Sequence, residues 1–169
     1  MKKFYRVGGP MGVGKTAACR LLKEQLPACA FLDGDWCWDM DPFVVNGETK
    51  AMVLDNICFV LNRFLHCSAF ENVVFCWVLH QQAIWDTILS RLDTAGWRVE
   101  RVVLLASPEV LAARLQADVA AGKRRPDVIP RSLARLPLYD EVDAVKIDTS
   151  ALTAEEAAAC IAGAGREEK

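Results

Sequence analysis

Near its start, this chain of 169 residues reads Gly9-Pro10-Met11-Gly12-Val13-Gly14-Lys15-Thr16, which fits the pattern G-x-x-x-x-G-K-[ST]. Residues 4–7 before it are mostly apolar and are predicted to form a strand. Residues 17–26 after it have apolar side chains at helical spacing. A strand, a glycine-rich loop and a helix in this order are the context in which the pattern forms a phosphate-binding loop, or P-loop. The stretch therefore predicts a nucleotide-binding fold.

The residue types of this motif explain how it binds a nucleotide. Glycines let the backbone N–H groups turn inward and approach a phosphate, and the N-terminus of the following helix adds its positive dipole end. Lys15 is expected to reach the β- and γ-phosphates, and the Thr16 hydroxyl to ligate Mg²⁺. A glycine-rich turn that binds nothing is the alternative, but it needs neither the lysine nor the hydroxyl. We therefore predict ATP and Mg²⁺ as cofactors, with the nucleotide bound by Gly9, Met11, Gly12, Val13, Gly14, Lys15, Thr16 and Ala17.

The composition is that of one globular domain in a reducing compartment. Apolar residues make up 53% of the chain and charged residues 25%, and the net charge of −2 does not favour nucleic acid as a partner. The seven cysteines form no C-x-x-C pair, so we expect buried free thiols. No signal-peptide apolar region follows the N-terminal Met-Lys-Lys, and no apolar run is long enough to span a membrane. We expect a cytoplasmic monomer or homodimer, with a single domain at residues 1–165 and a charged tail at residues 166–169.

The rest of the chain alternates between predicted strands and predicted helices. Ser107 with Pro108 indicates one helix start, and Thr153 with Glu156 forms a capping box at another. The alternation predicts an α/β fold: a P-loop NTPase fold with three layers, α/β/α, and a five-stranded parallel sheet. Further strands are predicted at residues 28–32, 73–79, 98–106 and 144–147, and further helices at residues 49–68, 81–94, 107–120, 127–139 and from 153 onward.

Two acids follow the second predicted strand, in the sequence Asp33-Gly34-Asp35. The carboxyl ends of parallel strands lie at one edge of the sheet, so these acids are expected beside the P-loop. We assign Asp35 to orient an acceptor hydroxyl or take its proton, and Asp33 to hold Mg²⁺ through water. The sequence alone does not decide which of Asp33 and Asp35 acts on the acceptor and which holds Mg²⁺. The alternative is a simple turn, because Asp-Gly is common in turns.

A basic region follows later in the chain, and we expect residues at about 120–135 to form a short Arg-rich lid. Arg124 and Arg125 are predicted to stabilise the charge on the transferring phosphoryl group. Arg114, on the preceding helix, is expected to reach the nucleotide. A solvated helix face is the alternative for each of these arginines.

Three further features lie at the predicted ligand edge of the sheet. Asp148, Thr149 and Ser150 close the fifth strand and are expected to contact the adenine, unless they form only a strand-to-helix turn. Trp36 and Trp38 form either a wall of the acceptor pocket or plugs of the core. His80 is either close to the site or a hydrogen-bonded structural histidine.

These motifs together resemble the small P-loop kinases, which include shikimate and gluconate kinases, adenylylsulfate kinase, chloramphenicol phosphotransferase and nucleoside and nucleotide kinases. The matching segments are residues 9–16, 32–35, 114–135 and 147–150, and within the family the chain is most similar to bacterial nucleotide kinase-like ATP-binding proteins. The resemblance implies that Asp35 contacts the acceptor hydroxyl, that the 120s form the lid and that residues 148–150 lie on the adenine side.

The chain departs from that family at the positions that select the acceptor. Leu79-His80-Gln81 stands where shikimate kinases have a glycine triplet, and Trp36-Cys37-Trp38 replaces the residues that follow the second acid in gluconate and adenylylsulfate kinases. The resemblance therefore implies the reaction type and leaves the acceptor open.

The sequence favours an ATP-dependent phosphotransferase that moves the γ-phosphoryl group to a hydroxyl or phosphate of a small molecule. A nucleoside or nucleotide is the first expected acceptor, and an antibiotic or metabolite hydroxyl the second. The alternative is an ATP-binding regulatory switch that acts through a protein partner. A third class is a protein that binds a nucleotide without catalysis. The presence of Lys15, Thr16, Asp33 and Asp35 argues against it.

Overall fold

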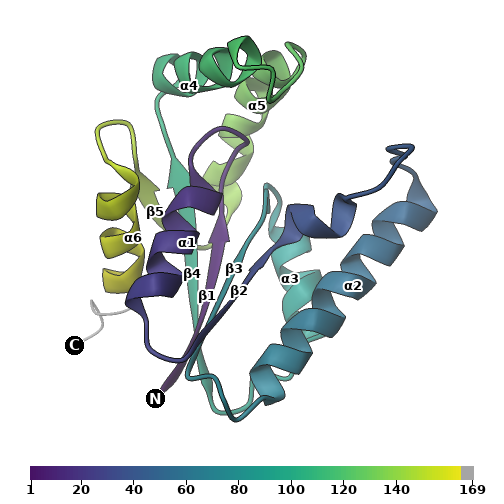
Figure 1. Ribbon diagram of the computed structural model, residues 1–169, viewed down its shortest axis with the longest axis vertical. Coiled ribbons are helices and arrows are strands. Elements are labelled where there is room, and N and C mark those ends of the chain that lie inside the picture. The colour runs from purple at the N-terminus through teal and green to yellow at the C-terminus, as the bar shows by residue number, and fades with distance from the viewer. Residues whose placement is uncertain (165–169) are drawn as a thin grey trace.

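The computed structural model describes residues 1–164, in which five parallel strands form one sheet with the order β2-β3-β1-β4-β5 (Figure 1). The predicted α/β fold with a five-stranded parallel sheet is confirmed. The predicted charged tail at residues 166–169 lies outside the described residues. The strands are β1 (Lys2–Gly8), β2 (Cys29–Asp33), β3 (Asn72–Cys76), β4 (Trp97–Leu105) and β5 (Val145–Asp148).

Helices cover both faces of the sheet. Neighbouring side chains of each strand point to opposite faces, and both faces carry apolar side chains that pack against helices. Tyr5 and Val7 of β1 pack in one apolar cluster with α1, α4 and α6, whereas Phe4 packs in a second cluster with α2 and α3. Each cluster lies between one face of the sheet and the helices that cover it, so the fold has three layers. The helices are α1 (Lys15–Gln25), α2 (Gly47–His66), α3 (Gln82–Ser90), α4 (Pro108–Ala120), α5 (Val128–Arg135) and α6 (Ala154–Gly163), with short 3₁₀ turns η1 (Gly34–Trp38) and η2 (Leu136–Glu141).

Local capping fixes where several helices begin. The Ser107 hydroxyl accepts a hydrogen bond from the Val110 N–H at 3.3 Å at the start of α4, and Thr153 and Glu156 form the predicted capping box of α6. A second capping box, which the sequence analysis did not identify, joins Asn46 and Thr49 at the start of α2.

The third strand is shorter than expected, since it ends at Cys76 and not at residue 79. Leu79 has a left-handed backbone conformation with φ of 44°, which turns the chain out of the sheet. The buried Trp85 indole donates a hydrogen bond to the Leu79 carbonyl at 2.7 Å and so supports this turn. The segment between β3 and α3 is therefore a loop at the carboxyl edge of the sheet.

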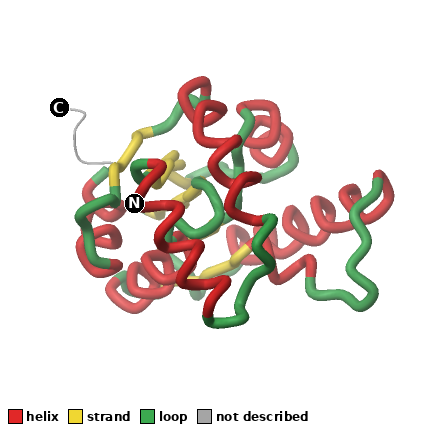
Figure 2. Tube along the Cα trace, turned by 90° about the horizontal axis from the view of Figure 1, so that it is seen from above, coloured by secondary structure: helices red, strands yellow, loops and turns green. Residues whose placement is uncertain are grey.

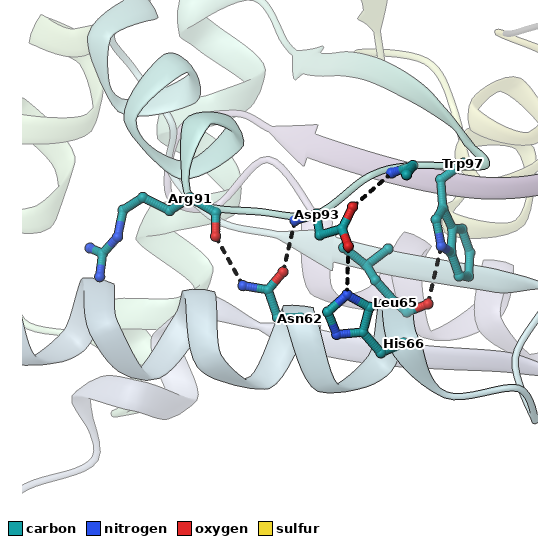
Figure 3. A network of polar contacts seen from close by, with 7 residues as sticks. Asn62, Leu65, His66, Arg91, Asp93 and Trp97 are labelled. Atoms are coloured by element: carbon teal, nitrogen blue, oxygen red, sulfur yellow. Dashed lines mark hydrogen bonds and ion pairs between the residues drawn. The ribbon is translucent and has the colours of Figure 1, made fainter.

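The C-terminal end of α2 is attached to the loop between α3 and β4 by a polar network (Figure 3). The Asn62 amide donates to the Arg91 carbonyl and accepts from the Asp93 N–H, both at 2.9 Å. His66 contacts Asp93 at 2.9 Å, and the Trp97 indole donates to the Leu65 carbonyl at 3.1 Å. The network ends the third helix at Ser90, four residues before the predicted boundary.

The opposite end of α2 projects away from the sheet, together with the loop before it, as two perpendicular views agree (Figures 1 and 2). That loop and the connection between α4 and α5 both lie at the carboxyl edge of the strands (Figure 1). Of the helices described, none has the length and apolar character required to cross a bilayer.

Candidate active site

The loop between β1 and α1 has the backbone conformation that its glycines permit. Gly9 and Gly12 have φ values of 149° and 84°. A Cβ at Gly9 would lie 2.5 Å from the Leu104 carbonyl oxygen, and one at Gly12 would lie 2.5 Å from a methyl carbon of Leu115. Larger residues at these two positions would therefore displace either the loop or the elements packed against it.

Lys15 spans this loop from the first turn of α1. Its ammonium group donates hydrogen bonds to the carbonyl oxygens of Gly9 at 2.7 Å and Pro10 at 2.9 Å. Burial lowers the pKa of Lys15, while the Cys76 thiol and the carboxylates of Asp35 and Asp33 act in the opposite direction. The ammonium group therefore lies close to both acids that follow β2.

Thr16 and Asp33 join the P-loop to the end of β2. The Thr16 hydroxyl donates a hydrogen bond to Asp33 Oδ2 at 2.6 Å, and Asp33 Oδ1 accepts from the Asp35 N–H at 3.0 Å. Among residues 1–164, no group of three or more His, Cys, Asp or Glu side chains is arranged to hold a metal. A hydroxyl beside a carboxylate nevertheless fits Mg²⁺, which takes most of its oxygen ligands from water and substrate phosphates.

Asp35 lies in the first turn of η1, beside the indole of Trp77. Loss of hydration raises the pKa of Asp35, and so does the neighbouring Asp33 carboxylate. Lys15, Arg124 and a hydrogen bond from the Trp77 side chain act in the opposite direction. The backbone of Gly34 packs on Trp77, and a Cβ at Gly34 would lie 2.6 Å from the indole. The sequence analysis did not single out Trp77, and so it missed the contact of this residue with Asp35.

A cavity of about 240 Å³ lies on the other side of the P-loop. Arg114 of α4 reaches it and donates to the Val13 carbonyl at 3.2 Å, to the Thr149 hydroxyl at 3.2 Å and to the Thr149 carbonyl at 2.8 Å. The lining residues are Val13, Gly14, Ala17, Arg114, Thr149, Leu152, Thr153, Ala154 and Ala157.

The other two residues expected on the adenine side do not line this cavity. The Ser150 hydroxyl donates to Asp148 at 2.5 Å and accepts from the Ser107 N–H at 2.8 Å. Asp148 and Ser150 thus fix the turn between β5 and α6, whereas Thr149 faces the cavity.

A second cavity, of about 650 Å³, lies between the loop that follows η1 and the segment that joins α4 to α5. The predicted lid residues Arg124 and Arg125 both line it, and α5 is attached to the P-loop because the Ser132 hydroxyl donates to the Met11 carbonyl at 2.9 Å. The lining residues are Met11, Asp41, Pro42, Phe43, Arg124, Arg125, Asp127, Val128 and Arg131.

Trp36 and Trp38, the aromatic residues that follow Asp35, do not line this cavity. Trp36 packs edge-on against Phe31 with ring centroids 5.2 Å apart, and Trp38 packs with the α2 cluster and with Phe43 at 5.9 Å. Phe43, which the sequence analysis did not single out, is the aromatic residue that lines the cavity, with 66% of its surface exposed.

His80 lies in the loop between β3 and α3 and is half-buried. Its Nδ1 atom is buried and has no hydrogen-bond partner among the described residues. Burial lowers the pKa of His80, and Arg135 contributes in the same direction. Of the two alternatives for His80, the hydrogen-bonded structural histidine thus finds no support at Nδ1.

Comparisons with known proteins agree with this fold. The family model described as "AAA domain" matches residues 6–129. A gluconokinase from Sinorhizobium meliloti 1021 is similar in structure, with a TM-score of 0.67 and 22% identity over 97% of this chain and 92% of that one. A search of the curated proteins finds no match.

Two further solved structures have the same fold. A tunicamycin resistance protein from Deinococcus radiodurans has a TM-score of 0.66 and 20% identity over 96% of this chain and 95% of that one. Shikimate kinase from Acinetobacter baumannii, in complex with shikimate, has a TM-score of 0.59 and 25% identity over 96% and 92%. The resemblance to small P-loop kinases is confirmed.

Proposed function

The chain belongs to the AAA-domain family, and from this premise we propose that it is an ATP-dependent phosphotransferase that acts on a small molecule. One observation carries the proposal: Thr16 bonds Asp33, and Asp33 bonds the backbone of Asp35, at 2.6 Å and 3.0 Å. The Thr16 hydroxyl of the P-loop is thereby joined, through the Asp33 carboxylate, to the backbone of Asp35, whose own carboxylate stays exposed. A simple Asp-Gly turn would not require this connection to the P-loop.

Lys15, Thr16, Asp33 and Asp35 would each have a part in phosphoryl transfer. This reaction depends mostly on positioning and charge stabilisation. Lys15 would exchange its bonds to the Gly9 and Pro10 carbonyls for oxygens of the β- and γ-phosphates. The Thr16 hydroxyl and Asp33 would hold Mg²⁺, which neutralises phosphate charge when bound. Asp35 would orient the acceptor hydroxyl and take its proton.

Arg124 and Arg114 would act from the other side of the nucleotide. Arg124 donates to Asp118 at 3.2 Å and lies close enough to Asp35 to lower its pKa, so it would reach the transferring phosphoryl group on closure of the lid. Arg114 and Thr149 line the smaller cavity, in which we place the adenine.

The acceptor remains a hydroxyl or phosphate of a small molecule, with a nucleoside or nucleotide as our first candidate. Support for a small-molecule acceptor comes from the names of the similar structures, a gluconokinase and a shikimate kinase. We further propose a cytoplasmic setting, supported by seven free cysteines.

The test is ADP release from Mg·ATP by the purified protein with a panel of acceptors. The panel contains nucleosides, nucleoside monophosphates, sugars, hydroxy acids and antibiotic alcohols. We expect acceptor-dependent turnover that falls by about 10²- to 10³-fold in Lys15→Ala, because this substitution removes one preorganised donor to the phosphates. Thermal unfolding of the variant should be nearly unchanged, since Lys15 lies in the first turn of α1 and belongs to neither apolar cluster.

Two results would contradict the proposal. Wild-type turnover in Lys15→Ala would exclude the P-loop as the site of transfer. ATP binding without turnover by any acceptor, together with a change of partner or oligomeric state between ATP and ADP, would favour the regulatory switch.

A further inference from the structure

We infer that the protein forms a homodimer through the outward face of α2. The α2 helices of two copies would pack antiparallel about a two-fold axis that passes between residues 55 and 56. The partner is thus a second copy of this chain. The inference goes beyond the proposed function and does not depend on it, because no step of phosphoryl transfer uses this face of the helix.

Exposed apolar side chains gather on α2 and on the loop before it. Among the residues that the structure describes, nine large apolar side chains are exposed, and five of them lie between residues 43 and 59. These five are Phe43, Val44, Val45, Met52 and Phe59. Phe59 is 67% exposed and Met52 42%, although the solvated face of a helix is normally polar. Such a gathering of apolar surface marks an interaction site.

Met52 and Phe59 lie on the face of α2 that points away from the core. They are two helical turns apart, so their side chains lie in one row along the helix. Glu48 and Arg63 extend this row by four residues at either end, and both are exposed. Figure 1 shows α2 at one side of the molecule, with no other helix or strand beyond it. The opposite, buried face consists of Val53, Ile57, Cys58, Leu61 and Leu65.

This row of side chains is complementary to a reversed copy of itself. Residues 48 and 63, like residues 52 and 59, lie equally far from the midpoint between residues 55 and 56. In an antiparallel pair about a two-fold axis at that midpoint, Met52 would pack on the partner's Phe59. Glu48 would face the partner's Arg63, and the symmetry makes each contact twice. A parallel pair would instead place glutamate against glutamate and arginine against arginine, which is unfavourable.

The charges of this face are available for a partner. Among residues 1–164, neither Glu48 nor Arg63 forms an ion pair. Asp55, at the centre of the row, is paired with Arg91 of its own chain. It would face the partner's Asn56, whose amide can donate a hydrogen bond to a carboxylate. The antiparallel pair therefore places no like charges opposite each other.

The size of this face predicts a dimer of moderate strength. An interface along one 20-residue helix is smaller than the standard interface of about 800 Å² per partner. We therefore expect a dissociation constant of about 1–100 μM.

The loop before α2 connects the proposed interface with the candidate site. Phe43 of this loop lines the larger cavity. The acceptor would bind in that cavity, because Arg124 also lines it and lies close to Asp35. A contact along α2 would thus act on a loop that forms one wall of the cavity.

The first experiment is sedimentation velocity of the purified protein over concentrations from about 1 to about 300 μM, which cover the expected dissociation constant. We expect a reversible equilibrium between monomer and dimer. Phe59→Glu should raise the dissociation constant at least about 100-fold, because it removes an aromatic anchor from each subunit and places a charge in the contact. Val145→Glu is the matched control, since Val145 is 49% exposed but lies on β5, at the far edge of the sheet.

Charge reversal then tests the antiparallel arrangement. Glu48→Arg and Arg63→Glu each place like charges opposite each other twice, and each should raise the dissociation constant about 10-fold. Mixed in equal amounts, the two single variants carry opposite charges at both contacts, so the mixture should associate about as tightly as the unmodified protein. A folding defect could not produce this recovery. The same reversal on α1, Arg20→Glu with Glu24→Arg, is the control and should have no effect. Thermal unfolding shows that each variant is folded.

Three results would overturn the inference. A monomer at every concentration would leave this face to a partner of a different sequence. A dimer that Phe59→Glu does not weaken would place the interface elsewhere on the molecule. A mixture of the two charge variants that associates no better than either alone would exclude the antiparallel pair. None of these results affects the proposed phosphotransferase, which the Lys15→Ala experiment tests separately.

Discussion

The two sides of the candidate site are built in different ways. On the nucleotide side, the P-loop is one continuous segment whose polar groups bond each other, as Lys15 does with Gly9 and Pro10. On the acceptor side, the larger cavity is lined by the P-loop, the loop before α2 and the α4–α5 segment, and its arginines and Phe43 are exposed. The nucleotide side is thus formed before binding. On the proposed acceptor side, Arg124 and Arg131 form partly exposed pairs with Asp118 and Asp127, and Arg125 forms no ion pair among residues 1–164.

This difference indicates a division of labour within the site. A preformed loop suits a ligand common to many enzymes, because its contacts are made by backbone groups that any sequence with these glycines provides. An open cavity with exposed cations suits a ligand that differs from one enzyme to the next. Substitutions on the two sides should therefore have separable effects.

The largest expected effect comes from the residue that joins the two sides. Asp35→Asn should lower kcat by about 10²- to 10⁴-fold, since it removes the group that takes the acceptor proton. The KM of ATP should change little, because the P-loop is untouched. Steady-state kinetics with varied ATP measures both parameters. If ATP binding weakened and kcat survived, Asp35 would belong to the nucleotide side.

A smaller effect is expected from a matched pair of glycines. Gly12→Ala places a methyl group 2.5 Å from Leu115 at a residue with φ of 84° and should lower the free energy of unfolding by about 1–3 kcal/mol, with weaker ATP binding. Gly47→Ala, in the first turn of α2, meets no atom within 4 Å and should be nearly neutral. Denaturant unfolding of both variants tests the contrast, and a neutral Gly12→Ala would mean that the P-loop is not rigid.

The smallest expected effect is a shift in the pH dependence of kcat/KM. Asp33 raises the pKa of Asp35, so removal of that negative charge in Asp33→Asn should lower it. If Asp35 acts as a carboxylate, as proposed, activity rises with pH through its pKa, and the acidic limb of kcat/KM should move to lower pH in the variant. Glu24→Gln, on the exposed face of α1, is the control. An unmoved limb would show that another group limits activity in acid.

Local sequence signals predicted most of the fold and the glycine-rich loop between β1 and α1. The spacing of apolar residues, the glycines of the P-loop and the capping residues Ser107 and Thr153 all act within a few positions of each other, so the sequence displays them directly. The position of Asp33 beside the P-loop also followed from the shared edge of parallel strands, although its hydrogen bond with Thr16 was not predicted.

Contacts between distant segments could not be predicted in this way. Nothing near Trp77 in the sequence indicates its hydrogen bond to Asp35, which depends on the order of β2 and β3 in the sheet. Phe43 lines the larger cavity only because its loop faces a segment some 80 residues further along the chain. The end of β3 was missed because an apolar run continues through Leu79, whose backbone turn is supported by Trp85.

The polar network around Asn62 gives helix α2 a fixed pivot at one end (Figure 3). The helix has 20 residues and is about 30 Å long, so a tilt of about 5° at the pivot moves its other end by roughly 3 Å. That other end follows directly on the loop with Phe43, which lines the larger cavity. A tilt of α2 about this pivot would therefore change the width of the larger cavity, although the residues of the pivot lie at the opposite edge of the sheet.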